Sequence, residues 1–223
     1  ERDFEGRAVI PSRPSLALID ALIEDWADEW LTKAMFHYRW AFEADTAKAA
    51  AVLPYWADTT LDEDAHAQIS TWFRDRQVER LALVGSTKQT ASVLEDSYRR
   101  FLRVFDAHLR EHPFLMGGRP GASDFAVYGQ LTQLALFDQT SMEVTLEESA
   151  RVYAWVECME DLSGSEPDAW LDADALPATL HRILTEVGRV YAPFLLANAR
   201  ALADGAEQLE VELDGRVFSQ PPF

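Results

Sequence analysis

Hydrophobic residues recur at helical spacing along most of this chain. After Pro14 the apolar positions are Leu16, Ile19, Leu22, Ile23, Trp26 and Trp30. The polar positions between them are acidic, namely Asp20, Glu24, Asp25, Asp28 and Glu29. Because steps of three and four residues return to one side of an α-helix, the pattern predicts an amphipathic helix that runs to about Trp40 and carries these carboxylates on its outer side.

Two later segments carry the strongest helical signals. Residues 91–109 place their aromatic and aliphatic side chains on one side of a helix. The stretch 125–137 has no charged residue, so it predicts a helix buried at the centre of the domain. It is shorter than the roughly 18 apolar residues that a membrane span needs. Further helices are predicted within 69–84, 152–162 and 180–191.

Turn and cap residues place the boundaries between these helices. A hydroxyl residue followed three positions later by Glu or Gln can satisfy the free backbone N–H groups at a helix start. That spacing predicts helix starts at Thr60–Glu63, Ser86–Gln89 and Thr145–Glu148. Pro54 is expected to break any helix within 41–59, and Gly85 to end one. Asp214-Gly215 is a turn signal in the last segment.

These elements predict an all-α fold, a helical bundle whose neighbouring helices are antiparallel and joined by short loops. We divide the chain into a linker-like segment at 1–14, a helical domain at 15–205 and an irregular tail at 206–223. The chain has no initiator Met, and its first residues do not resemble a natural start. We therefore expect it to be a fragment of something longer.

Composition narrows the classes of partner and compartment. The formal net charge of −18 repels phosphate backbones and anionic lipid heads, so neither nucleic acid nor a membrane surface is an expected partner. The single cysteine, Cys158, excludes a disulfide framework and is expected to be a core thiol in a reducing compartment. The sequence shows no signal peptide and no transmembrane run, which predicts a cytoplasmic protein.

Two histidine motifs match patterns that occur in metal sites. His108 to His112 reads H-x-x-E-H, a zinc-peptidase pattern, but it lies in the last turn of a helix just before Pro113. Glu63 to His66 reads E-x-x-H, half of a di-iron motif, and no convincing second copy is present. We therefore expect no metal, and we assign the first motif a helix-end role, which the helix dipole favours.

Two clusters of residues are each compatible with either a structural or a ligand-binding role. The acidic run at 24–29 can be a solvated or interface-forming helix face, or a site for a hard cation. Residues 35–40, Met-Phe-His-Tyr-Arg-Trp, can line a pocket for a flat or anionic ligand. Alternatively, the apolar members belong to the core and Arg39 pairs with one of the many carboxylates.

The stretch 113–131 resembles the signature region of the C-terminal helical domain of glutathione S-transferases. That family shows a glycine-containing turn, a proline, a Ser or Thr helix cap and an aspartate three residues later. Here the matching residues are Gly117-Gly118, Pro120, Gly121 and Asp124. The resemblance implies that Asp124 is a structural cap that accepts backbone N–H bonds. Gly121 departs from the usual hydroxyl residue, which should weaken the cap by a few tenths of a kcal/mol.

Residues 22–40 are similar to the first helix of that domain in a bacterial-type subgroup, and 1–14 resembles the linker that leaves the first domain. The resemblance implies a transferase in the intact protein, with glutathione as co-substrate and an apolar electrophile as its target. This chain would supply the wall of the hydrophobic-substrate pocket and part of a homodimer interface. The residues expected to face the substrate are Trp26, Trp30, Met35, Tyr38 and Trp40.

The family's N-terminal thioredoxin-like domain, which supplies the thiol-activating residue, is absent from this sequence. The catalytic residue is therefore unknown, and we expect neither glutathione binding nor activity from this chain alone. The alternative is a non-catalytic helical module for interaction or ligand binding, because one fold serves many functions.

Overall fold

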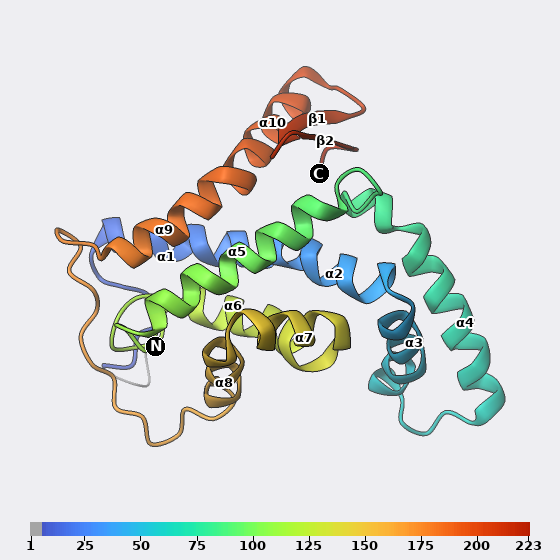
Figure 1. Ribbon diagram of the computed structural model, residues 1–223, viewed down its shortest axis with the longest axis horizontal. Helices are drawn as coiled ribbons and strands as arrows, with labels where there is room; N and C mark the ends of the chain where they lie inside the picture. The colour runs from blue at the N-terminus through green and yellow to red at the C-terminus, as the bar shows by residue number, and fades with distance from the viewer. Residues whose placement is uncertain (1–5) are drawn as a thin grey trace.

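The computed structural model describes residues 6–223, which are mostly helical (Figure 1). The first long helix consists of α1 (Pro14–Trp26), a π-helical turn (Ala27–Leu31) and α2 (Thr32–Ala41). The elements that follow are α3 (Glu43–Ala57), α4 (Glu63–Glu79), a 3-10 turn (Leu81–Val84) and α5 (Ala91–Leu109). Next come α6 (Ala122–Leu131), a π-helical turn (Thr132–Phe137), α7 (Gln139–Glu148) and α8 (Ala150–Met159). The chain continues with α9 (Ala178–Glu186), a π-helical turn (Val187–Tyr191), α10 (Ala192–Asp204), β1 (Leu209–Leu213) and β2 (Arg216–Gln220).

The predicted helical bundle is confirmed, and residues 6–223 contain no thioredoxin-like β-sheet. The helix α5 runs through the middle, with α9 on one side and α6, α7 and α8 on the other (Figure 1). Its apolar side meets the first long helix, where the Trp26 and Phe101 rings lie edge to face at 4.9 Å. The uncharged stretch forms most of α6 and the π-helical turn after it. Both contribute buried side chains to the core, although one side of α6 is exposed.

Pro54 does not break the helix: it lies inside α3, so this prediction is wrong. Proline has no N–H, so the carbonyl one turn earlier, that of Ala50, loses its partner in the helix. The Ser70 hydroxyl of α4 donates to this carbonyl at 2.7 Å. The neighbouring helix thus replaces the missing bond.

The caps used differ from those predicted. The Asp62 carboxylate caps α4 by accepting from the Ala65 N–H at 2.8 Å, and the Ser149 hydroxyl caps α8. Both residues have the extended backbone from which a side chain can reach back to the helix N–H groups. A hydroxyl residue followed three positions later by Glu or Gln occurs at several places in the sequence. Which residue caps a helix depends on the backbone conformation of the chain where it enters that helix. Thr60, Ser86 and Thr145 therefore do not cap these helices. The helices α4, α5 and α8 begin three to five residues after them, at Glu63, Ala91 and Ala150.

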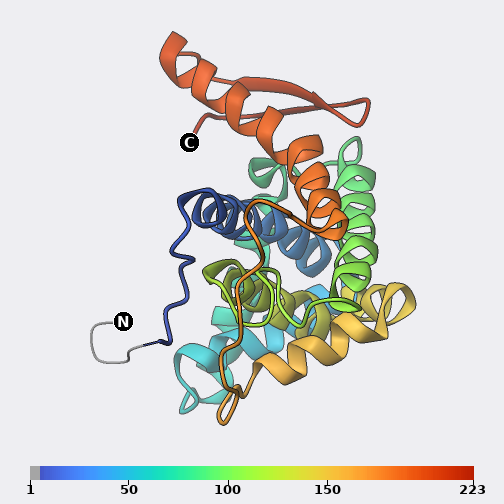
Figure 2. The ribbon, with the colours of Figure 1, turned by 90° about the vertical axis from the view of Figure 1, so that its left-hand side faces the viewer.

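The tail is a β-hairpin, so the prediction of an irregular segment at 206–223 is wrong. The strands β1 and β2 pair antiparallel around Asp214-Gly215, the predicted turn, where both residues have positive φ. Leu209, Leu213 and Phe218 are buried in the core. The short alternation of leucines with glutamates was too weak to predict a strand. Together α10 and the hairpin project from one end of the bundle (Figures 1 and 2).

Two further expectations concern exposure and the start of the chain. Cys158 is exposed on α8, so the prediction of a core thiol is wrong. The cysteine lies beside the buried side of the helix, which contains Val156 and Met159.

The linker-like segment 1–14 is described only from residue 6, and residues 1–5 lie outside the described part. Within residues 6–223, no helix has both the length and the apolar character that a membrane span requires.

Candidate functional site

The residues predicted to face a substrate lie mainly in the core. Trp26, Trp30 and Tyr38 are fully or almost fully buried, and the Trp30 indole N–H donates to Ser97 at 3.1 Å. Met35 is half-buried. Trp40 is also largely buried, although it lines a shallow surface pocket with Phe42 and Arg74. The structure therefore spreads these side chains along one helix and does not gather them around one cavity.

Arg39, in the middle of the same cluster, forms a buried ion pair. Its Nε and Nη2 atoms donate to the two carboxylate oxygens of Asp138 at 2.9 Å each, and Nη2 also donates to the Gln133 side chain at 2.7 Å. Burial raises the pKa of Asp138, and the guanidinium opposes that rise. Tyr38 and Trp40 therefore pack in the core and Arg39 pairs with a carboxylate, whereas Met35 and Phe36 are only half-buried.

Asp124 holds the turn that leads into α6. Its carboxylate accepts from the backbone N–H groups of Leu115 at 2.8 Å and Gly121 at 2.9 Å, as the resemblance leads us to expect. Burial raises the pKa of Asp124 to about 7, while these N–H bonds act in the opposite direction. The side chain does not reach the surface, which fits a role in folding and not in chemistry.

Asp20 supplies the cap that Gly121 lacks. We expected Asp20 on the outer side of its helix, but it is buried and points at the start of α6. Its carboxylate accepts from the backbone N–H and the hydroxyl of Ser123 and from the Ala122 N–H. A side chain at Gly121 would overlap the Asp20 carboxylate and bring its Cβ within 2.8 Å of Met116. A carboxylate from another helix thus occupies the place of the usual Ser or Thr hydroxyl.

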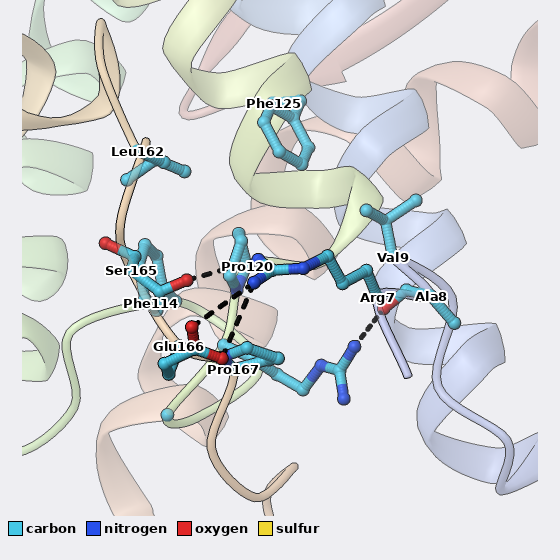
Figure 3. Close-up of a pocket in the computed structure, with 12 residues that line it drawn as sticks. Arg7, Ala8, Val9, Phe114, Pro120, Phe125, Leu162, Ser165, Glu166 and Pro167 are labelled. Carbon is cyan, nitrogen blue, oxygen red and sulfur yellow. Dashed lines mark hydrogen bonds and ion pairs between the residues drawn. The ribbon is translucent and has the colours of Figure 1, made fainter. Parts of the chain in front are cut away.

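An apolar pocket of about 190 Å³ lies beside the start of α6 (Figure 3). Its walls are Phe114, Pro120, Phe125, Leu162 and Pro167 together with residues 7–9 and 118–119. Arg7 closes one side by donating to the Ser165 carbonyl and to Glu166. Phe125 keeps 42% of its surface exposed at this pocket.

The segment before α1 is fastened to this pocket. The Arg119 guanidinium donates to the carbonyls of Gly6 and Ala8, and the Ala122 N–H donates to the Val9 carbonyl. Figure 2 shows this segment along the outside of the bundle before it enters α1. Residues 7–9 and Phe125 therefore line the same pocket.

The histidine motif at the end of α5 has structural partners. The ring nitrogens of His108 lie 3.0 Å from the Thr179 hydroxyl and 3.1 Å from the Phe114 carbonyl. Burial lowers the pKa of His108 to about 4. No group of three or more potential metal ligands is present within residues 6–223. His108 thus ties the end of α5 to the start of α9.

This burial predicts a pH-dependent stability. Between pH 6.5 and 4 the unfolded chain protonates His108, whereas the folded chain does not, so the free energy of unfolding falls as the pH drops. His108→Gln removes this titration, and the gap between wild type and variant should move by about 3 kcal/mol in favour of the variant between pH 7 and pH 4. Urea denaturation across this range measures the gap. Parallel curves for the two proteins would contradict a neutral buried His108.

A second histidine network was not anticipated from the sequence. In it, His37 Nδ1 lies 2.8 Å from the Ser86 hydroxyl, and Nε2 lies 3.1 Å from the Glu95 carboxylate. The order matches a Ser–His–acid triad, but both Ser86 and His37 are buried away from any substrate. Burial lowers the pKa of His37. The network fastens the turn before α5 to α2.

Comparison with known families identifies the central part of the chain. Residues 74–158 match the sequence model of the glutathione S-transferase C-terminal domain family. The matched segment runs from the second half of α4 to α8, contains Asp124, and covers less than half of the chain. No curated protein and no solved structure gives a significant match to the sequence.

Proposed function

We propose that this chain is the C-terminal helical half of a glutathione S-transferase-like enzyme. The observation that carries the proposal is the family match at 74–158, whose signature aspartate, Asp124, pins the buried entry to α6. In the intact enzyme a glutathione thiolate would attack an apolar electrophile. An N-terminal thioredoxin-like domain would bind glutathione and activate its thiol, and this chain would wall the electrophile's pocket.

The proposal places the missing domain against the outer surface of α1 and α6. These two helices pack together, and both expose large apolar side chains: Leu18 at 70% and Phe125 at 42%. The segment that would connect the domains is already fastened beside Phe125. Among the predicted substrate residues, Met35 and Trp40 are the better candidates for contact, since Met35 keeps exposed surface and Trp40 lines a pocket. A homodimer and a cytoplasmic location complete the proposal.

A conjugation assay tests the division of labour between the two halves. We would compare this chain with a version extended upstream by its native sequence, using a general aromatic electrophile and glutathione. Only the extended protein should conjugate, because the thiol-activating residue lies in the missing domain. Turnover by this chain alone would contradict the proposal, as would inactivity of both proteins without glutathione binding in calorimetry.

A surface variant tests the docking face. Phe125→Glu should raise the KM for the electrophile or weaken domain association in the extended protein, because it puts a charge into an apolar contact. The matched control is Leu202→Glu, which changes an apolar residue on α10 that is 56% exposed and lies away from α6. Equal effects of the two variants would place the domain interface elsewhere.

The alternative, a non-catalytic interaction module, is favoured by one feature. The helix α4 buries none of its residues and exposes Trp72 and Ile69. Between α3 and α4 lies an apolar groove of about 280 Å³, with Asp58 as its only charged lining residue among residues 6–223. Inactivity of the extended protein, with no glutathione binding, would favour this function.

A further inference from the structure

Lys33 carries a buried amine that has no carboxylate partner among residues 6–223. It lies just past the π-helical turn of the first long helix, with 7% of its surface exposed. Its Nζ donates to the Val84 carbonyl and to the Gln220 side chain, both at the long distance of 3.4 Å. Within residues 6–223, no carboxylate lies within ion-pair distance of it. The Phe194 ring lies 4.7 Å from Nζ.

The amine lies in a pocket of about 410 Å³ that is separate from the one beside α6. Its apolar walls come from the 3-10 turn and the end of the hairpin: Leu83, Val84, Pro221, Pro222 and Phe223. The Asn198 side chain holds the Phe223 backbone through two hydrogen bonds, at 2.7 and 3.0 Å. Glu29 is the one other charged residue of the lining within residues 6–223.

This environment increases the fraction of the amine that is neutral. Burial lowers the pKa of Lys33 to about 8, and the Glu29 carboxylate opposes that change. At pH 7 the neutral fraction is then about 200-fold larger than for a lysine with an ordinary pKa of about 10.4. Desolvation in an apolar pocket is one of the ways in which a lysine amine is activated as a nucleophile.

We propose that Lys33 is a nucleophilic amine that forms imines with small apolar aldehydes entering this pocket. The Nζ lone pair attacks the carbonyl carbon, the carbonyl π bond breaks, and one proton moves from nitrogen to oxygen. The resulting carbinolamine then loses water to give the carbon–nitrogen double bond. A neutral carbonyl fits this site better than an anion does, because Glu29 lines the pocket and the chain carries a net charge of −18. The inference does not depend on the proposed transferase function.

The chain contains its own controls, because it has three lysines: Lys33, Lys48 and Lys88. The other two are exposed. We would incubate the protein with butanal and cyanoborohydride, which reduces each imine to a stable amine, and then map the modified lysines by mass spectrometry. At pH 7, Lys33 should react at least roughly tenfold faster than Lys88, after allowance for its lower basicity and restricted access. An equal or slower rate at Lys33 would overturn the proposal.

Three variants and a second probe sharpen the test. Lys33→Met should lose the fast labelling phase and raise the urea midpoint, which also shows that it folds; persistence of the fast phase would overturn the proposal. Glu29→Gln should speed labelling of Lys33 at pH 7, because the carboxylate that stabilises the ammonium is gone; slower labelling would contradict this role. Lys88→Arg should leave the rate at Lys33 unchanged. Faster labelling by the anionic aldehyde glyoxylate than by butanal would overturn the assignment to apolar aldehydes.

Discussion

Asp20→Ala should lower the free energy of unfolding by about 3 kcal/mol, because it removes the acceptor of two backbone N–H groups and a hydroxyl at the buried start of α6. Gly121→Ser alone should cost about 2 kcal/mol, since its side chain would overlap the Asp20 carboxylate. Urea denaturation of both variants measures these losses.

The two substitutions should compensate each other. With Asp20→Ala the carboxylate is gone, and the hydroxyl introduced by Gly121→Ser can cap the helix in the usual way. The double variant should therefore lose about 2 kcal/mol, and not the roughly 5 that independent effects would give. Gly129→Ser is the matched control: this glycine is in the same helix with nothing within 4 Å of its Cβ position, so little change is expected. Additive losses would show that Asp20 does not replace the cap.

The second large effect is expected at the buried ion pair. Arg39→Met should destabilise the protein by about 3 to 5 kcal/mol at pH 7.5, because it leaves the fully buried Asp138 carboxylate without its counter-charge. Arg39→Lys should also be harmful, since lysine cannot donate to both carboxylate oxygens in the geometry of a guanidinium. Equilibrium urea denaturation provides the measurement.

The loss in Arg39→Met should depend on pH in a defined direction. Without the arginine, burial raises the pKa of Asp138 further above that of the unfolded chain. The folded variant then holds a proton that the unfolded chain releases, so its stability falls as the pH rises from 5 to 7.5. Arg13→Ala is the control: its pair with Asp174 is exposed on both sides and should contribute less than about 1 kcal/mol. A pH-independent loss would argue against a buried Asp138 charge as its cause.

Much of the fold follows from helical periodicity, which depends on contacts that are close in sequence. The apolar stripe of α5 and the uncharged stretch of α6 were predicted because packing selects those residue types at each turn. The failures involve partners that are distant in sequence. Pro54 is tolerated because Ser70 donates from another helix, and the hairpin depends on leucines that pack into the core.

The site shows the same division between local and distant information. Asp124 was identified because its turn, proline and glycine lie within a few residues. Asp20 was missed, although it lies four residues after Leu16 and three before Ile23, on the buried side of the helix. That spacing was an available signal. Nothing in the sequence linked Lys33 to Gln220, or His37 to Ser86, because only the folded chain brings them together.

Because Asp20 supplies this cap, the family-matched segment is not expected to fold independently of α1. Asp20 lies outside residues 74–158, yet it completes the first turn of the helix at the centre of that segment. Its carboxylate and Ser123 are 103 residues apart in sequence, so this contact closes a long loop during folding. Late docking of α1 would leave the core helix uncapped until then. A fragment with the bounds of the sequence match would contain α6 but lack the residue that caps its N-terminus.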